Sequence, residues 1–393
     1  MKFKSLFLIL VLIEISAKSL FGGSLIGKFG IGERQTIVSA RSLGMGGVNI
    51  VLNDAFNYSR WNPAQWIFVR PVRINFLYNT NYNQVENGVN GLFTEFGGFS
   101  MGFPIGSEFV VGGGIYPLST SNYSLVQTGV ENSVPWRLRV DGRGGISTFG
   151  LGVAYIVKDN LSIGIKNDWV FGNKIQEWST TFEGTGFLDG EFTKLTSFDG
   201  SIFTLSSFIQ QKDFNYALSL SLPIGFSLKR DIELQFTDDI IESEKDIGYP
   251  VELRLGISYD FGERYRYAFE YQRSDWSSFD TDFDGQYGTA YDILSGIERN
   301  SKTTRAAFLD KLALRGGLSF RKLYVKTFDN GDIFETSVSF GLGIPIHKGK
   351  ENIDLGLAFV FRDNENTTLP KEKGILINIG YSASELWFVR KSR

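Results

Sequence analysis

The stretch Val251–Phe261, VELRLGISYDF, alternates without a break between two kinds of residue. Every second residue, starting at Val251, is apolar or aromatic, and the residues between them are Glu, Arg, Gly, Ser and Asp. Because successive side chains of a β-strand point to opposite faces, this pattern predicts a strand with one apolar and one polar face. The segment 264–272 repeats the pattern after Gly262–Glu263, which predicts a hairpin with a short turn.

Segments of the same kind recur between Pro71 and Phe388, for example at 149–157, 214–222, 338–346 and 375–381. We count about 13 of them, and since a bacterial single-chain barrel has an even number of strands, we predict 14. The uncounted strand is placed in the irregular stretch 180–211. The predicted fold class is all-β, a transmembrane antiparallel β-barrel over residues 71–393.

Alternation by itself also fits a soluble sandwich whose apolar faces point inward. Two features of the segments favour a membrane barrel. Their length of about 9 to 14 residues suits a tilted strand that crosses a bilayer. Aromatic residues cluster near their ends, as in the girdles of outer-membrane barrels.

The N-terminus supplies a third argument for the membrane. Lys2 and Lys4 precede the apolar run Leu6–Ile15, which the small pair Ser16–Ala17 follows. This is the layout of a secretory signal peptide, and its apolar core is too short to span a bilayer. We predict a signal peptide over residues 1–17, with Gly22 as a second cleavage point and an uncleaved anchor helix as the alternative. The predicted location is the outer membrane.

The composition excludes several classes of function. The chain has no Cys, so disulfides cannot hold an exported fold, whereas a closed barrel pairs every strand edge. Its net charge of -3 argues against nucleic acid as a partner. With His347 as its one histidine and no grouping of catalytic or metal-ligating residues, we predict no enzymatic activity, no metal and no cofactor. The acidic run 237–246 is interpreted as a solvated loop rather than a Ca²⁺ site.

The predicted connections differ in length at the two ends of the barrel. Short turns are expected at 158–160, 262–263 and 347–351, on the periplasmic side. Long loops are expected on the outer side, at 119–145, 172–200, 237–248 and 277–310. The composition of residues 291–308 predicts a small helix in the last of these loops.

Residues 18–70 do not alternate cleanly, and we predict that they form a compact plug, or hatch, inside the barrel. The run Gly44, Met45, Gly46 and Gly47 permits tight backbone paths and close approach to other segments. The Asn-Pro pair that begins the run Asn62, Pro63 and Ala64 marks a turn. This second run is interpreted as a structural turn of the plug or as part of a gate.

The segment 40–64, ARSLGMGGVNIVLNDAFNYSRWNPA, resembles the N-terminal hatch of the FadL-type family, outer-membrane transporters of long-chain fatty acids and other hydrophobic compounds. The stretches 265–280 and 335–361 resemble later strands of that family. Two features depart from its pattern: Gln65 stands where a Gly is frequent, and a basic tail follows Trp387–Phe388. A related group of barrels that assists protein secretion shares the same N-terminal pattern.

The resemblance implies passive uptake of hydrophobic small molecules, such as fatty acids or hydrocarbons. They would be captured at the extracellular loops, admitted by a plug movement and released sideways through the wall. Outer-membrane lipids are then the surroundings, and we expect a monomer. The alternative is a barrel that does not transport and serves as a secretion accessory or surface scaffold.

The triplet Gly112, Gly113 and Gly114 interrupts the apolar strand 109–116, and several Gly in a strand commonly mark a bulge or kink. Because a kink in an early strand opens the wall in the FadL-type family, we hypothesise that the triplet marks such an opening. The alternative is a lumen-side point of close contact with the plug. Asp275–Trp276 is expected to cap a strand at the membrane interface rather than to contact a ligand.

Overall fold

The computed structural model of the protein describes residues 23–69, 71–86, 90–131, 133–184, 187–235, 240–280, 285–302, 308–327, 329–346, 350–365 and 370–385. The predicted signal peptide, His347 and the pair Trp387–Phe388 lie outside these residues.

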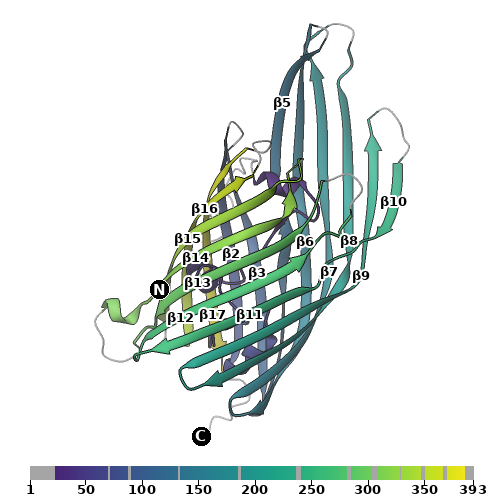
Figure 1. The fold of residues 1–393 in the computed structure, drawn as a ribbon. Helices are drawn as coiled ribbons and strands as arrows, with labels where there is room; N and C mark the ends of the chain where they lie inside the picture. The colour runs from purple at the N-terminus through teal and green to yellow at the C-terminus, as the bar shows by residue number, and fades with distance from the viewer. Residues whose placement is uncertain are drawn as a thin grey trace.

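The wall of the molecule is one antiparallel sheet that closes on itself (Figure 1). Its strands are β2 (Val72–Val85), β3 (Gly91–Ile105), β4 (Phe109–Thr120), β5 (Tyr123–Glu131), β6 (Val134–Lys158), β7 (Leu161–Phe182), β8 (Gly190–Gln211), β9 (Phe214–Leu234), β10 (Ile240–Asp246), β11 (Glu252–Phe261), β12 (Tyr265–Asp275), β13 (Thr289–Arg299), β14 (Ala313–Lys326), β15 (Asp332–Ile346), β16 (Glu351–Asn364) and β17 (Glu372–Glu385). Pairing of β17 with β2, from Glu372 opposite Val85 onward, closes the barrel.

Two pairs of these strands each make one strand of the wall. β4 and β5 both pair with β6, with a one-residue shift of register between Pro117 and Ser119 and an interruption at Ser121–Asn122. β10 and β11 pair with β9 in a single register, interrupted at 247–251. The barrel therefore has 14 strands, which confirms the predicted fold class and strand number. The uncounted strand is β8, which lies within the expected stretch 180–211.

The two faces of the wall settle the choice between a sandwich and a membrane barrel. On β7, Ile165 and Trp169 point outward and are 47% and 46% exposed. The inward-pointing Lys166 and Asp168 are 3% and 1% exposed and form an ion pair at 2.5 Å. An apolar exterior around a polar interior is the arrangement of a barrel surrounded by lipid.

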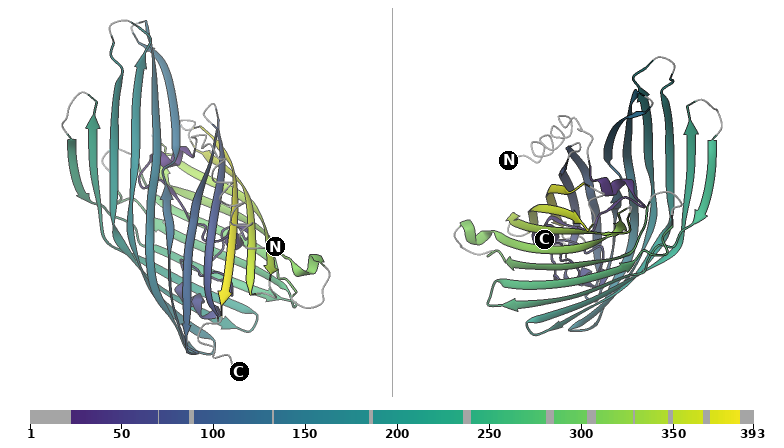
Figure 2. Two further views of the ribbon diagram at one scale, coloured as in Figure 1. Left: turned by 180° about the vertical axis from the view of Figure 1, so that it is seen from behind. Right: turned by 45° about the horizontal axis from the view of Figure 1, so that its top comes forward.

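The wall has two unlike ends. At the turn end, strands are joined by tight connections at 106–108, 159–160, 212–213 and 262–264, which include two of the predicted short turns. At the opposite end, β5 to β10 rise far beyond the other strands and form the extension (Figure 1; Figure 2). The predicted long loops at 119–145, 172–200 and 237–248 are therefore wrong, because most of their residues belong to these strands.

The extension is not evident from the sequence, because the outer faces of its strands are polar. The outer face of β9 carries Tyr216 and Leu218 below Gly225, and the exposed Lys229 and the half-buried Asp231 above it. Gly225 has a φ of +59°, so the alternation changes phase at this residue. Beyond the lipid no apolar face is required, and the pattern that reveals membrane strands is lost.

The prediction for 277–310 is also wrong. Residues Thr289–Arg299 form strand β13, and a 3-10 helix, η3, occupies only Phe308–Lys311. β13 points Ala290 and Leu294 into the barrel, so helix-forming residues occupy positions that a membrane barrel usually gives to polar ones.

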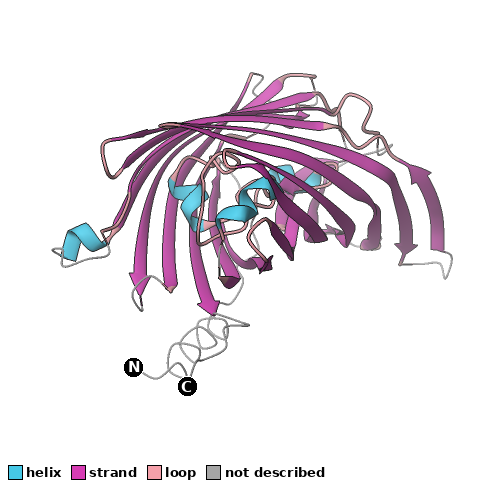
Figure 3. Ribbon diagram, turned by 90° about the horizontal axis from the view of Figure 1, so that it is seen from below, coloured by secondary structure: helices cyan, strands magenta, loops and turns pink. Residues whose placement is uncertain are grey.

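Residues 23–69 lie inside the barrel and form the plug (Figure 3). The plug contains η1 (Leu25–Lys28), the short strand β1 (Glu33–Arg34), α2 (Ala40–Gly44) and η2 (Pro63–Phe68). α2 packs against β14 to β17, and η2 packs against β4 and β6 to β8. No helix in the described ranges has both the length and the apolar character needed to cross a membrane.

Candidate functional site: the plug and its border with the wall

The motif 44–47 ends α2 and continues into a turn pressed against the wall. Met45 is fully buried. Gly46 has a φ of +71°, and a Cβ atom there would lie 2.6 Å from the carbonyl oxygens of both Ser295 and Leu318. A residue with a side chain fits neither this conformation nor this space, so the glycine is required by plug packing.

The wall carries glycines where it receives this motif. They form two cross-strand pairs, Gly296 opposite Gly317 and Gly341 opposite Gly356. A Cβ atom on any of the four would collide with the backbone of plug residues Ala40 to Gly46. The motif and these inward-facing glycines are therefore complementary, although more than 240 residues separate them in the chain.

The turn Asn62-Pro63-Ala64 fastens the other end of the plug. The Asn62 side chain caps η2 by accepting a hydrogen bond from the Ala64 N–H at 3.0 Å, and Pro63 takes the first helical position. The same N–H donates to the Ser206 hydroxyl at 3.0 Å, and the Ser162 hydroxyl donates to the Ala64 carbonyl at 2.9 Å. These bonds attach the turn to β7 and β8.

Gln65 occupies the position at which the motif departs from the FadL-type pattern. Its amide group donates to the Asn49 carbonyl oxygen at 3.0 Å, and its side chain is buried. Gln65 thus ties η2 to the earlier part of the plug.

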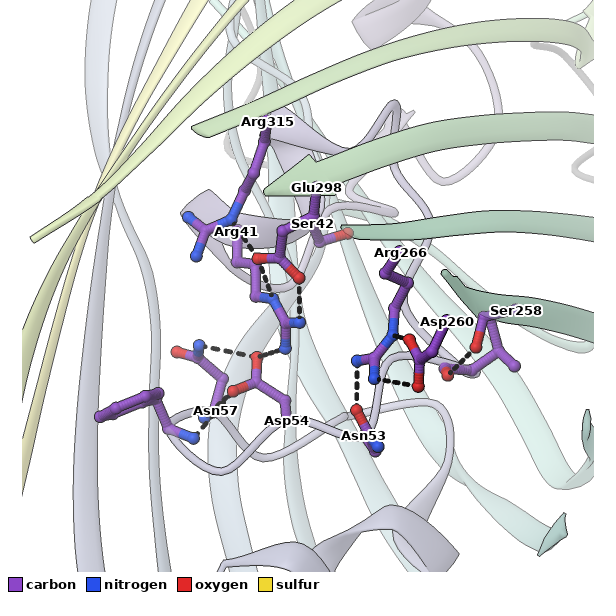
Figure 4. A network of polar contacts seen from close by, with 12 residues as sticks. Arg41, Ser42, Asn53, Asp54, Asn57, Ser258, Asp260, Arg266, Glu298 and Arg315 are labelled. Atoms are coloured by element: carbon purple, nitrogen blue, oxygen red, sulfur yellow. Dashed lines mark hydrogen bonds and ion pairs between the residues drawn. The ribbon is translucent and has the colours of Figure 1, made fainter. Parts of the chain in front are cut away.

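Arg41 of α2 holds the plug through a buried cluster of charges (Figure 4). Its guanidinium group lies 2.9 Å from the Asp54 carboxylate and 2.5 Å from that of Glu298. Glu298 also lies 2.7 Å from Arg315, which in turn lies 2.5 Å from Asp354. The cluster joins two plug residues to β13, β14 and β16.

The electrostatic balance at Asp54 favours its charged form. Burial would raise the pKa of this carboxyl group, but the nearby Arg41 guanidinium and hydrogen bonds from Asn57 and Phe56 outweigh burial. The pKa of Asp54 therefore lies below its usual value.

A second group of charges surrounds Trp61 of the plug. The guanidinium groups of Arg60 and Arg254 lie 4.3 Å and 3.8 Å from the centre of the Trp61 rings. Arg254 is fully buried and lies 2.5 Å from Glu252. Sequence reasoning missed both charge clusters, although charged residues at inward-facing strand positions such as 252 and 254 were their signal.

The triplet Gly112, Gly113 and Gly114 is fully paired in the wall. Its residues lie opposite 100–102 of β3 on one side and 150–152 of β6 on the other, without a shift of register. A Cβ atom on Gly112 would lie 3.2 Å from the Trp66 ring of η2. The geometry at the triplet is thus that of the alternative, a close contact with the plug.

The wall becomes unpaired directly above this triplet. The last pair between β3 and β4 is Phe99 opposite Ile115. Beyond it, β4 and β5 pair with β6, and no described pairing joins them to β3 (Figure 2). A hydrogen bond between the Glu95 and Thr120 side chains crosses this unpaired border.

The N-terminal part of the plug fills the unpaired border from inside. β1 pairs with β4, with Glu33 opposite Thr120, and the Ser119 hydroxyl donates to the Ile31 carbonyl oxygen. Gly23 lies between Asn122 of the wall and the Phe93 ring of β3. Residues 23–35 of the plug therefore lie along the part of the wall where β3 and β4–β5 are not paired.

Aromatic side chains cover the plug near the extension. Trp276 is fully buried, with ring centroids 5.0 Å from Tyr249, 5.2 Å from Phe279 and 4.5 Å from Tyr324. Tyr249 stacks on Phe226 of β9 at 4.2 Å. The expectation that Trp276 lies at the membrane interface is wrong, because the chain turns inward after β12 and buries the indole.

Two small cavities lie inside the barrel. One of about 90 Å³ lies between the plug and the wall towards the extension, and its lining includes Ile26, Leu376, Arg321 and Arg362. Another of about 200 Å³ lies at the turn end beside the charge cluster of Arg41. In the parts of the chain that the structure describes, no three His, Asp or Glu side chains are grouped as metal ligands.

The family model of BamG matches residues 2–392. The chain belongs to the BamG family. In structure, it is similar to the CymD monoaromatic hydrocarbon channel, with a TM-score of 0.65 and 17% identity over 90% of this chain and 99% of that one. No curated protein matches it in sequence.

Two further solved structures resemble this BamG-family chain. The Ralstonia pickettii toluene transporter TbuX has a TM-score of 0.60 and 17% identity, over 89% of this chain and 99% of that one. A Pseudomonas aeruginosa FadL homologue has a TM-score of 0.56 and 12% identity, over 91% and 99%. The fold predicted from the motif at 40–64 is therefore confirmed as that of the FadL-type channels.

Proposed function

We propose that the protein is an outer-membrane channel for the passive uptake of hydrophobic small molecules, such as hydrocarbons or fatty acids. The observation that carries the proposal is the unpaired border between β3 and β4–β5, which residues 23–35 of the plug fill. Plug residues complete the wall at this border. When these plug residues move, the wall can open sideways without breaking a strand pair of the barrel. The solved channels with this fold, two of them named for toluene or monoaromatic hydrocarbons, support this substrate class.

Capture would take place on the inner face of the extension, which points outward from the cell. Trp178 and Phe192 stack there with centroids 5.2 Å apart, and the inward-facing Leu234 and Ile241 are 40% and 54% exposed. An apolar molecule gains about 25 cal/mol for each Å² of apolar surface removed from water, here and again on entry into the bilayer. Uptake down a concentration gradient then needs no energy source.

The Gly112–Gly114 hypothesis is modified in one respect. The paired triplet lies at the lower end of the unpaired border, and the proposed exit begins beyond Ile115, the last residue of β4 that pairs with β3. In the proposed movement the turn at 62–64 stays attached to β7 and β8, while residues 23–35 withdraw.

A reversible disulfide between β1 and β4 tests this proposal. Glu33 and Thr120 lie directly opposite each other across the β1–β4 pair, and the chain has no other cysteine to interfere. We expect Glu33→Cys/Thr120→Cys vesicles to lose uptake of a fluorescent fatty acid when oxidised and to regain it on reduction. Each single-cysteine variant is the matched control. Uptake by the oxidised double variant at the rate of its reduced form would refute release at this border.

The alternative function, a scaffold for partner proteins, is favoured by a different observation. On the sides away from β6 and β9, β5 and β10 have no partner among the described strands of the extension. Unpaired strand edges are templates for pairing with another chain. If this second function is the correct one, deleting residues 126–139 should abolish retention of a partner, and vesicles that contain the full chain should take up a fluorescent fatty acid no faster than protein-free vesicles.

A further inference from the structure

Arg362 of β16 is bonded to three carboxylates at once. Its guanidinium group donates to Glu335 of β15 at 2.7 Å and to Glu372 of β17 at 2.9 Å. It also donates to Glu33 of β1, in the plug. We call these four residues the carboxylate cluster. One positive charge thus serves three negative ones inside the barrel.

A second guanidinium group, that of Arg321, gives the cluster little further compensation. Arg321 lies 3.2 Å from Glu335 and 3.8 Å from Asp292 of β13, so two carboxylates share its charge. Glu95 of β3 is a further carboxyl group that interacts electrostatically with Glu33. The additional carboxyl groups therefore outnumber the additional cation.

The remaining cations near the cluster are paired with other residues. Besides Arg321 and Arg362, the cavity of about 90 Å³ is lined by two cationic side chains, those of Arg34 and Lys322. Arg34 pairs with Glu252, and Lys322 pairs with Asp332. Within the described part of the chain, the carboxylate cluster therefore keeps more negative than positive charge.

Glu372 and Glu33 contact the plug segment 23–35 in different ways. One carboxylate oxygen of Glu372 accepts a hydrogen bond from the Ser24 hydroxyl at 2.8 Å, and the other accepts one from the Leu25 N–H at 2.7 Å. Glu372 therefore fastens the start of the segment to the wall. Glu33 belongs to the segment itself, and among the described residues its carboxylate is hydrogen-bonded to Arg362 alone.

The closed position of the segment is unfavourable for a charged Glu33. Its side chain is 17% exposed and lines the cavity of about 90 Å³. Burial raises the pKa of Glu33 above its usual value of 4.5. Arg362 opposes this increase, whereas Glu335 and Glu372 add to it. Withdrawal of the segment would return the carboxylate to water, so loss of the Glu33 proton favours withdrawal and its uptake favours closure.

We propose that Glu33 regulates the exit: its surplus charge keeps residues 23–35 poised to withdraw, and a proton on its carboxyl group locks them in place. This inference rests on the proposed release at the border between β3 and β4–β5. Closure is strongest below about pH 4.5, the usual pKa of a glutamate, and weakens as the pH rises through the raised pKa of Glu33.

Labelling of a buried cysteine measures the withdrawal. The Ser119 hydroxyl donates to the Ile31 carbonyl oxygen, so Ser119→Cys places the chain's only thiol beneath the segment. Ser219→Cys is the matched control, because Ser219 is fully buried and bonded to Trp61, next to the turn that stays attached. The rate of labelling by a water-soluble maleimide, divided by the rate for the unfolded protein at the same pH, reports opening.

Two substitutions of the same kind should have opposite effects on the labelling of Ser119→Cys. Glu33→Gln should slow it at about pH 7, because surplus charge is removed and Arg362 keeps two carboxylates. The change is about tenfold if the pKa of Glu33 is higher by one in the closed state than in the open state. Glu372→Gln should speed it, because the two donors bond to different oxygens and an amide has only one. Neither substitution should alter the labelling of Ser219→Cys.

The pH dependence tests the proposal without a substitution at Glu33. Labelling of Ser119→Cys should be faster at about pH 7 than at about pH 4.5, and Glu33→Gln should remove this difference. Equal rates at the two pH values in Ser119→Cys, or labelling of Glu33→Gln that is unchanged or faster, would overturn the proposal. The label reports withdrawal and not transport, so the expected labelling without any uptake would refute the proposed function alone.

Discussion

Gly44 of α2 and Gly341 of β15 meet backbone to backbone, so close that a Cβ atom on Gly44 would lie 2.6 Å from the Gly341 Cα atom. This contact joins the hatch motif to a strand nearly 300 residues later in the chain. Plug and wall therefore fit each other at the level of the main chain, and the fit has measurable consequences.

Gly341→Ala should destabilise the protein, because its new methyl group would lie 2.9 Å from the Gly44 Cα atom and displace the plug. Overpacking of this kind costs roughly 1–3 kcal/mol. The free energy of unfolding in urea measures it. Gly316→Ala is the control, since the nearest atom to its methyl group would be 4.0 Å away. Equal stability of the two variants would show that the plug does not depend on this contact.

Glu298→Gln should release the plug from β13, because Glu298 pairs with both Arg41 and Arg315. Removing one partner of a buried ion pair costs roughly 3–5 kcal/mol. Glu177→Gln removes the exposed pair with Arg143 and should cost only about 0–1 kcal/mol. Protease cleavage within the plug reports its release, and resistance in Glu298→Gln equal to that of Glu177→Gln would argue against the charge cluster as a fastener.

The lowered pKa of Asp54 predicts an acid dependence of plug stability. A carboxyl group whose pKa is lower in the folded state stabilises that state above its unfolded pKa, near 3.8. This stabilisation disappears as the pH falls through the folded-state pKa. The difference in melting temperature between the wild type and Asp54→Asn should therefore be largest at neutral pH and shrink below pH 3.8. A difference that is constant down to pH 2 would be inconsistent with this linkage.

Trp169 and Trp276 should respond differently to lipids that carry bromine on their acyl chains. Trp169 is 46% exposed on the outer face of β7, whereas Trp276 is fully buried inside the barrel. We expect Trp169→Phe to remove much of the quenching of tryptophan fluorescence by such lipids and Trp276→Phe to leave the quenched component unchanged. The reverse result would mean that the apolar face of β7 does not contact lipid.

The barrel could be predicted because lipid imposes a repeating constraint on each strand that crosses it. In Val251–Phe261 the apolar side chains face outward and the polar ones inward, and the alternation carries over directly into β11. The same reasoning failed where the constraint ends. Residues 173–182 and 227–234 belong to strands of the extension, and their largely polar outer faces give no such pattern.

The candidate site was predicted only in part. The glycines of the hatch motif and the turn at 62–64 indicated close contacts of the plug, because glycine and Asn-Pro have few other structural uses in so short a segment. Nothing in the triplet at 112–114 could show that its two neighbouring strands remain paired, since pairing is a property of three segments together. The border therefore had to be located in space, where it begins beyond the pair of Phe99 and Ile115.

The sequence by itself determined the barrel, its strand number and the existence of a distinct N-terminal segment, because each rests on a local, periodic or compositional pattern. The tertiary structure alone decided which strands remain unpaired, that residues 23–35 fill that border, and that Arg41, Glu298 and Arg315 meet. These relationships join residues that are far apart in the chain. Such contacts depend on the closure of the barrel around the plug, and no stretch of sequence records that closure.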